Sequence, residues 1–260
     1  MTRAYKKILV ERENGIERVT LNYPERRNAI GPTMTNELLW AFADAHDADE
    51  VRAIVLTGSG KAFCAGGDFA EMAGGATGER LPHKGDYSDL LLAMVRADKP
   101  IIARVNGLAM GGGLGMVAAS HFAVAADDAV LGTPEIDVGL FPMMIMAVLA
   151  RYVPRRRLLQ MMLLGEKFSS GVGRELGLVS QVVAPSELDA AVKALADGLL
   201  SKSPMTIRLG LRAFGAQDDL DLESALPLLR DRLAECLSTD DAREGLTAFL
   251  EKRKPMWTGK

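Results

Sequence analysis

Residues 101–120 have the sequence IIARVNGLAMGGGLGMVAAS, and this stretch indicates the class of fold. Its first part, Ile101–Val105, predicts a buried strand. Three consecutive glycines, Gly111–Gly113, then predict a turn into an apolar helix that ends near Ser120. Val105 to Ala126 contains no Lys, Arg, Asp or Glu and is long enough to mimic a membrane span. Because adjacent glycines do not suit a lipid-exposed helix, we interpret the stretch as the interior of an α/β protein.

Strands and helices alternate along most of the chain around this stretch. Asn14-Gly15 is a strong signal for a hairpin turn between strands at Lys7–Glu11 and Ile16–Asn22. Further strands are expected at Ala53–Thr57, Phe122–Ala126, Val130–Gly132 and Val179–Val183, helices at 33–46, 68–72, 87–97, 187–201, 205–216, 222–236 and 240–252, and a loop at Gly58–Gly67. The pattern predicts an α/β core over residues 1–185 and a helical C-terminal region over residues 186–260, with no linker between them.

The composition of the 260 residues narrows the range of functions. The net charge of -3 argues against a nucleic-acid partner, which normally selects a basic excess. Hydrophobic residues make up 48% and charged residues 25%, which excludes extensive disorder. The two cysteines form neither a disulfide framework nor a zinc site, and they suit a reducing cytoplasm. The first apolar run, Ile8–Val10, is too short for a signal-peptide core, so we expect a cytoplasmic protein without a membrane partner.

Two glycine-rich segments share one design, residues 60–69 (GKAFCAGGDF) and residues 106–114 (NGLAMGGGL). In each segment a buried strand is followed by glycines and then directly by a helix. The first N–H groups of a helix point outward with a partial positive charge, and glycine lets a ligand oxygen approach them. Two such turns side by side would hold one carbonyl oxygen between two amides, which is an oxyanion hole. The alternative is that each turn serves only close packing.

Glu135 is the candidate proton carrier, within the segment Thr133-Pro-Glu-Ile-Asp137. One interpretation is structural: Thr133 caps a helix, Pro134 takes its first position, and the Glu135 carboxylate favours the positive end. The other is catalytic, because the apolar stretch Gly139–Leu149 follows directly. A carboxylate that faces such a wall would have a raised pKa, in the range useful for proton transfer. The sequence leaves both interpretations open.

Five motifs occur in the order and spacing of one protein family. They are Ala62-Phe-Cys-Ala-Gly-Gly-Asp68, Lys99-Pro-Ile-Ile-Ala-Arg-Val-Asn-Gly107, Gly111-Gly-Gly113, Pro134-Glu135 and Phe249-Leu-Glu-Lys-Arg-Lys254. Over nearly its whole length the chain resembles the crotonase (enoyl-CoA hydratase/isomerase) family. The resemblance implies a spiral of ββα units and a CoA thioester as substrate. It also implies a helical C-terminal region that forms homotrimers, often paired as hexamers.

The resemblance assigns roles to single residues. It places the two oxyanion-hole amides on Gly67 and Gly112 and the proton carrier on Glu135. It implies contacts to the substrate from three places, namely the loop after the first hairpin, the first glycine turn and the C-terminus, which hold Arg26, Arg27, Ala65, Asp68, Phe69, Phe249 and Lys252. The last two match positions that often reach the CoA of a neighbouring subunit. The basic residues among them would otherwise be ordinary surface charges. No metal and no cofactor besides the CoA of the substrate are implied.

One departure from the family pattern affects the reaction. Typical hydratases of the family carry a second glutamate where this chain has Gly115, and a Gly-rich segment where it has Met143-Met-Ile-Met146. Our leading hypothesis is an acyl-CoA lyase that adds or removes water across the C2=C3 bond. In a syn elimination Glu135 alone would take the C2 proton and protonate the C3 hydroxyl. A tertiary hydroxyl leaves more easily, so the resemblance extends to hydratases that act on 3-methylglutaconyl-CoA.

The acyl chain and the type of reaction have alternatives. A methylglutaconyl substrate carries a distal carboxylate, which Arg80, His83 and Lys84 would meet unless they are simply solvated. A double-bond isomerase is the second hypothesis, since it needs only Glu135 to move a proton between C2 and C4. The third is a catalytically silent scaffold that binds CoA or RNA. The net charge of -3 and the lack of a basic stripe count against RNA.

Overall fold

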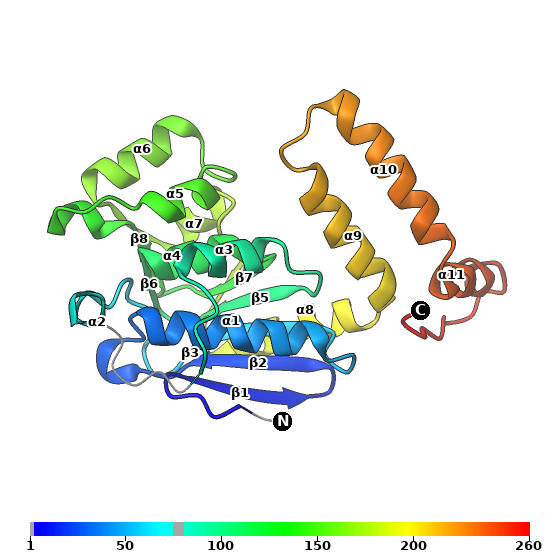
Figure 1. The fold of residues 1–260 in the computed structure, drawn as a ribbon, viewed down its shortest axis with the longest axis horizontal. Helices are drawn as coiled ribbons and strands as arrows, with labels where there is room; N and C mark the ends of the chain where they lie inside the picture. The colour runs from blue at the N-terminus through cyan, green and yellow to red at the C-terminus, as the bar shows by residue number, and fades with distance from the viewer. Residues whose placement is uncertain (1–2, 75–80) are drawn as a thin grey trace.

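The computed structural model describes residues 3–74 and 81–260. Its main layer is a six-stranded sheet in the order β1-β2-β3-β5-β7-β10 (Figure 1). The strands are β1 (Ile8–Glu13), β2 (Ile16–Leu21), β3 (Ala53–Gly58), β5 (Ile101–Val105), β7 (Phe122–Ala126) and β10 (Gln181–Val183). All neighbouring pairs are parallel except β1–β2, which is antiparallel. Each strand of this large sheet overlaps a stretch that the sequence predicts as a strand.

The first hairpin turns at the predicted dipeptide. Glu13 pairs with Ile16, so Asn14 and Gly15 form a two-residue turn, and both have positive φ values of 50° and 82°. Asn-Gly suits such a turn because these two residue types tolerate positive φ best. The Gly15 carbonyl also accepts the N–H of Arg52 at 2.7 Å, which sets the start of the neighbouring strand β3. The turn therefore fixes the register of two strand pairs.

A second, smaller sheet has the strand order β4-β6-β8-β9. The strands are β4 (Ala62–Cys64), β6 (Leu108–Met110), β8 (Val130–Gly132) and β9 (Lys167–Ser169). β4, β6 and β8 run parallel, and β9 is antiparallel to β8. Of these strands only β8 is predicted from the sequence, and the expectation of a loop throughout Gly58–Gly67 is wrong. Strands of three residues are too short to show a period-2 pattern, which explains the error.

A repeating path links the two sheets. Three successive units each pass through a strand of the large sheet, a strand of the small sheet and a helical segment. They are β3, β4 and α2 (Phe69–Gly74), then β5, β6 and α4 (Gly112–Ala119), then β7, β8 and the 3-10 helix η2 (Pro134–Val138). This is the ββα repeat that the resemblance implies. In each unit a short turn leads from the strand of the small sheet into the helical segment.

Helices cover both faces of the large sheet. α1 (Pro32–Asp47) packs on β1, β2 and α3 (Tyr87–Val95), and α8 (Leu188–Leu200) packs on β3, β5 and β7. In Figure 1 α1 lies in front of the sheet and α8 behind it. Both layers are needed because β3 is buried at every residue and β5 at nearly every residue. The largest fully buried side chains include Ile8, Leu21, Met34, Leu38, Leu56, Phe63, Leu90, Met94, Ile101 and Ile102.

The C-terminal helices stand apart from the two sheets (Figure 1). They are α9 (Pro204–Gln217), α10 (Leu222–Leu237) and α11 (Asp240–Leu250). Asp98 links α9 to the core, because its buried carboxylate accepts the guanidinium of Arg212 and lies 2.8 Å from Nδ1 of His46. The remaining helical segments are η1 (Pro24–Arg26), α5 (Met143–Leu149), α6 (Arg155–Leu164), α7 (Ser170–Glu175) and η3 (Pro185–Glu187). Within residues 3–74 and 81–260, no helix combines the length and the apolar character that crossing a membrane requires.

Candidate active site

Three segments singled out in the sequence meet at one edge of the small sheet. Residues 65–68 follow β4, Gly111 follows β6, and residues 133–135 follow β8. Because β4, β6 and β8 are parallel neighbours, their carboxyl ends lie side by side. Ligands of α/β proteins commonly bind at such carboxyl ends. The topology therefore assembles a candidate site from segments that are far apart in the chain.

The two glycine turns pack backbone against backbone. A Cβ atom added at Gly113 would lie 2.4 Å from the carbonyl oxygen of Cys64, a separation that real Cβ atoms essentially never show. A Cβ atom added at Gly66 would lie 3.3 Å from the carbonyl oxygen of Met110. Glycine is thus required at Gly113 for the turns to approach this closely. The sequence alone offers close packing and a shared ligand site as alternative roles for the glycine turns. The structure is compatible with both roles together.

Both predicted oxyanion-hole amides lie at the same cavity. Ile30 N–H donates to the Gly66 carbonyl at 2.8 Å, and Asp68 N–H donates to the Ile30 carbonyl at 2.8 Å. In a parallel bridge with this pattern, the N–H of the intervening Gly67 points to the other side. Gly112 is the first residue of α4, so its N–H has no acceptor within the helix. The fold therefore leaves two backbone donors for a ligand.

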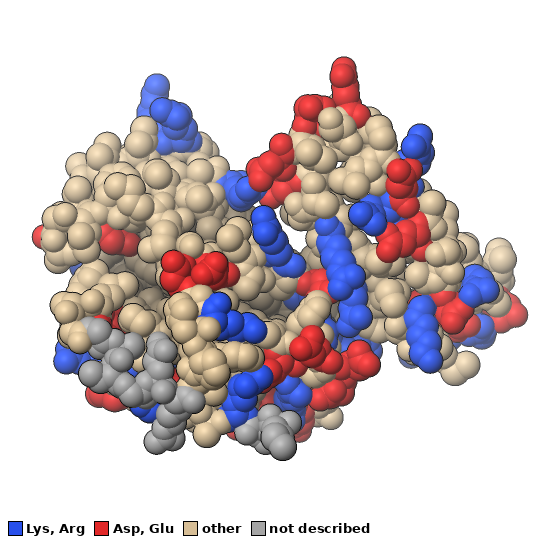
Figure 2. Space-filling view, in the orientation of Figure 1, with Lys and Arg blue, Asp and Glu red and all other residues tan. Residues whose placement is uncertain are grey.

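The cavity has a volume of about 580 Å³ and a mainly apolar wall. Ile30, Pro32, Met72 and the segment 140–145 supply apolar side chains to this wall. Several of them, including Leu140, Met143 and Met144, are also partly exposed at the surface. Figure 2 shows a mostly uncharged surface over α5, with basic side chains gathered at one end of α6. Among the described lining residues, the titratable side chains are those of His83, Asp86, Tyr87 and Glu135.

The Glu135 side chain borders this cavity. Its Oε2 atom is buried and has no hydrogen-bond partner among the described residues. Its Oε1 atom lies against Gly111, where an added Cβ would come within 2.7 Å of it. Gly111 has a φ of 50° and a ψ of -120°, a conformation that suits glycine. Burial raises the pKa of Glu135 above its ordinary value, as the apolar wall leads one to expect.

The local structure around Glu135 corrects one structural expectation. Pro134 does occupy the first position of a helical turn, the 3-10 helix η2. Thr133 does not cap it, because its hydroxyl donates to the Met161 carbonyl at 3.0 Å instead. That bond ties the start of η2 to α6 and holds the backbone of Glu135 beside the cavity. The capping role predicted for Thr133 is therefore wrong, and Glu135 occupies the first turn of a very short helix.

The sequence analysis missed Tyr87, which also lines the cavity. Its hydroxyl donates to the Gly112 carbonyl at 2.5 Å. Tyr87 is the first residue of α3, directly after Asp86, whose side chain accepts the N–H groups of Ser88 and Asp89 in a capping box. The capping pattern could have located Tyr87 at a helix start. Nothing in the sequence shows that this helix start faces Gly112.

The structure brings some of the predicted substrate contacts to the cavity and not others. Phe69 lines it and is 47% exposed. Asp68 is buried, lies 3.6 Å from the Lys7 ammonium, and accepts the Glu71 N–H, so it caps α2 rather than lining the cavity. Ala65 is half-buried, and its N–H donates to the Arg27 carbonyl at 3.0 Å. The side chains of Arg26 and Arg27 are exposed beside this turn, outside the described lining.

Phe249 and Lys252 lie far from the cavity of their own chain. Phe249 is at the end of α11, at the opposite end of the molecule from α2 and α5, and it is 80% exposed (Figure 1). Of the three basic residues considered for a distal carboxylate, His83 lines the cavity. The Lys84 ammonium instead lies 4.0 Å from the centre of the Trp40 ring. Arg80 lies outside the described residues.

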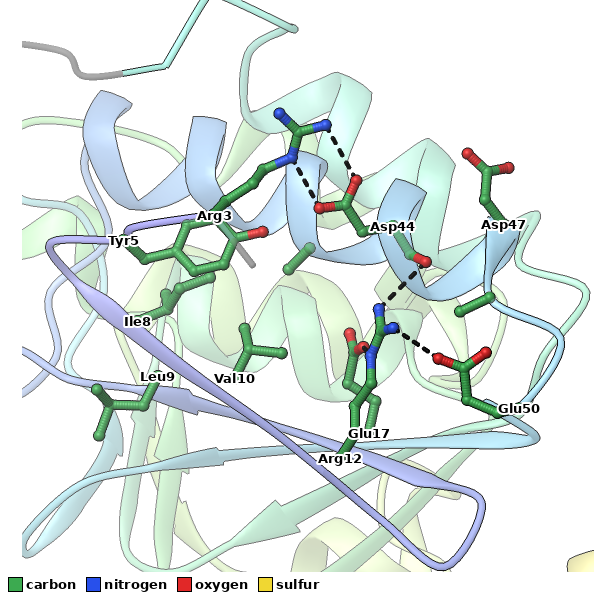
Figure 3. Close-up of a pocket in the computed structure, with 12 residues that line it drawn as sticks. Arg3, Tyr5, Ile8, Leu9, Val10, Arg12, Glu17, Asp44, Asp47 and Glu50 are labelled. Carbon is green, nitrogen blue, oxygen red and sulfur yellow. Dashed lines mark hydrogen bonds and ion pairs between the residues drawn. The ribbon is translucent and has the colours of Figure 1, made fainter. Parts of the chain in front are cut away.

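A larger cavity of about 1090 Å³ lies between the β1–β2 hairpin and α1. Figure 3 shows that its two arginines, Arg3 and Arg12, pair with acidic side chains of the same cavity. Arg12 bridges Glu17 at 2.6 Å and Glu50 at 2.9 Å, and Arg3 pairs with Asp44 at 2.7 Å. Glu17 is fully buried, and this burial raises its pKa. Because neither glycine turn nor Glu135 reaches this cavity, we interpret its ion pairs as structural.

The comparison with protein families agrees with the geometry. The family model described as enoyl-CoA hydratase/isomerase matches residues 11–260 of the chain. The chain belongs to this family. The crotonase resemblance predicted from five motifs is thus confirmed, as is the prediction of an enzyme. Among the described residues, no group of three or more His, Cys, Asp or Glu side chains is placed to hold a metal ion.

Curated relatives of this family share about a third of their residues with the chain. It is 33% identical to a crotonyl-CoA hydratase from Syntrophomonas wolfei over 260 residues, which cover 99% of this chain and 100% of the relative. It is 32% identical to a short-chain-enoyl-CoA hydratase from Clostridium acetobutylicum over 251 residues, which cover 95% of each chain. Both matches extend over nearly the full length of the relatives.

Solved structures of the family have the same fold. An enoyl-CoA hydratase from Mycobacterium smegmatis superposes with a TM-score of 0.90 at 36% identity, covering 97% of this chain and 99% of that one. Human enoyl-CoA hydratase domain-containing protein 3 superposes with a TM-score of 0.89 at 31% identity, covering 97% of this chain and 100% of that one. The predicted α/β spiral with a helical C-terminal region is confirmed.

Proposed function

We propose that this enzyme adds water across the C2=C3 bond of an enoyl-CoA and, in reverse, removes it from a 3-hydroxyacyl-CoA. The observation that carries the proposal is the buried, unpartnered Oε2 of Glu135 beside a cavity that also contains Gly67 and Gly112. An unsatisfied buried carboxylate destabilises the fold, so its presence supports a chemical role. The relatives named as crotonyl-CoA and short-chain-enoyl-CoA hydratases support the same reaction.

In the proposed mechanism, backbone N–H groups stabilise the negative charge and one side chain transfers the proton. The N–H groups of Gly67 and Gly112 donate to the thioester oxygen. Ionised Glu135 takes a proton from water while the water oxygen bonds to C3, and the electrons of the double bond move onto the thioester oxygen. Glu135 then returns that proton to C2. One oxyanion donor contributes about 2.7–4 kcal/mol to such a transition state. These steps require no cofactor beyond the CoA of the substrate.

For the acyl group we propose an apolar chain. The described lining of the cavity contains no Lys or Arg, and its thioether and aliphatic side chains suit an alkyl group. Asp86 lies at the same wall as His83, and its pKa is lowered chiefly by the Ser88 hydroxyl. An ionised Asp86 would repel a distal carboxylate. A branched 3-methylglutaconyl-type substrate would depend on His83 and Arg80, so we rank it below an unbranched enoyl-CoA.

A double-bond isomerase is the second candidate, favoured by Gly115 where typical hydratases of the family carry a glutamate. The two reactions differ in substrate. Separate incubation with a 2-enoyl-CoA, a 3-hydroxyacyl-CoA and a 3-enoyl-CoA, with product masses read directly, distinguishes them. Hydration gives a mass gain of one water from the 2-enoyl-CoA. Product from the 3-enoyl-CoA alone would overturn the hydratase proposal and support the isomerase.

The role of Glu135 is tested by Glu135→Gln. We expect kcat for hydration to fall by about 10²- to 10⁴-fold, because the amide cannot accept a proton from water. KM should change little, since the shape of the side chain is kept. Asp137→Asn is the matched control: it makes the same change two residues away in η2, on a side chain that is outside the described cavity lining. Full activity of Glu135→Gln would overturn the proposal.

For the assembly we propose a homotrimer or a hexamer of two trimers. Large apolar side chains are exposed on the C-terminal helices, among them Phe214, Leu222, Leu226, Leu233, Leu246 and Leu250. In such an assembly Phe249 and Lys252 would contact the CoA bound by a neighbour, and Arg26 and Arg27 the CoA of their own chain. Sedimentation equilibrium tests the stoichiometry. A monomer at micromolar concentration would overturn it.

A cytoplasmic location is also a proposal. The two free cysteines, Cys64 and Cys236, suit a reducing compartment. Some similar proteins are named as mitochondrial, which is the alternative location. We propose neither a nucleic acid nor a membrane as partner. On the face shown in Figure 2, Lys and Arg side chains are interspersed with Asp and Glu and form no single basic stripe.

A further inference from the structure

Tyr87 is the one phenol at the wall that holds Gly112 and Glu135, as far as the described residues go. Its hydroxyl donates to the carbonyl of Gly112 at 2.5 Å. Tyr87, Gly112 and Glu135 all line the same cavity. Tyr87 thus contacts the second glycine turn and shares the cavity wall with the proposed proton carrier. Tyr87 has no role in the mechanism proposed for Gly67, Gly112 and Glu135.

Tyr87 also fills the space that a side chain at position 115 would need. A Cβ atom built on Gly115 would lie 2.5 Å from the Tyr87 oxygen and 2.3 Å from Cγ2 of Ile145. Neither separation is possible for real atoms, so a glutamate at position 115 and the present Tyr87 exclude each other. The hydroxyl of Tyr87 is therefore the polar group that lies where a second carboxylate would begin.

The hydrogen bond that Tyr87 already makes determines whether its hydroxyl can donate or accept a second one. A tyrosine hydroxyl has one hydrogen to donate and lone pairs to accept with. The hydrogen is already directed to the Gly112 carbonyl, so the free capacity is that of an acceptor. Burial, with smaller contributions from Cys64 and Glu135, raises the pKa of Tyr87 well above its ordinary value, and the group stays a neutral phenol. A neutral acceptor can orient water but cannot take its proton.

We propose that Tyr87 is a further catalytic residue, whose hydroxyl oxygen accepts a hydrogen bond from the attacking water. This inference rests on the proposed hydratase function. One hydrogen of the water is directed to Glu135 and the other to Tyr87, which leaves an oxygen lone pair for C3. The C3–O bond forms, the proton on the Glu135 side moves to that carboxylate and then to C2, and Tyr87 keeps its own proton throughout. The phenol thus takes over the orientation of water while Glu135 alone carries the proton.

The test compares two reactions of Tyr87→Phe. The first is hydration of a 2-enoyl-CoA, which needs oriented water. The second is exchange of the C2 hydrogens of butyryl-CoA with deuterium in D₂O, which needs Glu135 and the oxyanion donors but no attacking water. We expect hydration kcat to fall by about 10- to 100-fold with little change in KM. We expect the exchange rate to stay within about twofold of the unmodified enzyme.

Tyr152→Phe is the matched control, because Tyr152 is a partly exposed phenol outside the described cavity lining. It should leave both reactions unchanged. If Tyr87→Phe hydrates normally, the inference is overturned. If it loses hydration and exchange in parallel, Tyr87 acts only by holding the Gly112 turn, and the inference is again overturned. Failure of the proposed function would show differently, as an unmodified enzyme that hydrates no enoyl-CoA.

Discussion

The two sheets of this molecule have different roles: the large sheet contains the longest buried strands, and the small sheet positions the candidate site. The large sheet is built from strands of up to six residues, and its central strands β3 and β5 are buried at nearly every residue beneath helices on both faces. The small sheet is built from strands of three residues, yet all three segments of the candidate site begin at its parallel strands. The large sheet therefore contains the longest stretches of buried strand, and the small sheet positions the segments of the candidate site.

This difference has a physical basis. Burial of apolar area is additive and tolerates small displacements, so long strands with covered faces serve stability. Alignment of donors and a proton carrier depends on fractions of an ångström, so it favours positions where backbones touch directly. The contact of Gly113 with the Cys64 carbonyl is of this second kind. Changes in the two layers should therefore have separable effects on stability and on turnover.

The largest expected effect on stability comes from Leu56→Ala in the large sheet. Leu56 is fully buried in β3, so its truncation should lower the free energy of unfolding by about 2–5 kcal/mol. Chemical denaturation followed by circular dichroism measures this loss. At a temperature where the variant is fully folded, its kcat should stay within about twofold of the unmodified enzyme. A large loss of kcat in the folded variant would mean that the large sheet also aligns the site.

Gly113→Ala tests the small sheet, where we expect a large loss of activity and a small loss of stability. The new methyl group would clash with the Cys64 carbonyl and push the two glycine turns apart. We expect kcat/KM to fall by roughly 100-fold, because the two amides lose their common alignment. Stability should fall by only about 1–3 kcal/mol, as for other overpacked sites.

Gly198→Ala is the control for Gly113→Ala. Gly198 lies in α8 with nothing within 4 Å of an added Cβ. This substitution should keep full activity and gain about 0.5–1 kcal/mol of stability, since alanine restricts the unfolded chain. Equal activity of the two glycine variants would show that the approach of the turns is not what aligns the site.

The smallest expected effect is the pH dependence of kcat/KM, and it is specific to Glu135. The proposed mechanism needs ionised Glu135, so kcat/KM should fall about tenfold per pH unit below the pKa of this carboxyl. Burial raises this pKa, so the decline should begin at higher pH than for an exposed glutamate. A decline centred at or below the ordinary glutamate pKa of 4.5 would contradict the assignment.

The same raised pKa has a consequence for stability. The folded protein binds the Glu135 proton more tightly than the unfolded chain does. The stabilisation from this proton is present below the unfolded pKa and is lost as the pH rises through the folded pKa. Glu135→Gln should therefore gain thermal stability over the unmodified enzyme at neutral pH, and the gain should disappear in acid.

Much of the fold was predictable because its signals are local. The apolar strands Ala53–Gly58 and Ile101–Val105 and the Asn14-Gly15 turn can be recognised within a few residues. β4, β6 and β9 could not be predicted, because three residues carry no usable periodicity. The site was predictable in part for the same reason. Gly67, Gly112 and Glu135 stand in recognisable motifs, whereas Tyr87 belongs to an ordinary helix start.

By itself the sequence determined the family, the alternation of strands and helices, and the candidate residues for carrying a proton and for donating to an oxyanion. Local patterns and motifs contain this information, because propensity, turn chemistry and glycine requirements act over a few positions. Only the tertiary structure decided that Asp68 pairs with Lys7, that Tyr87 meets Gly112, and that the space beside Gly115 is already filled. These are contacts between segments far apart in the chain, and they depend on how β4, β6 and β8 pair.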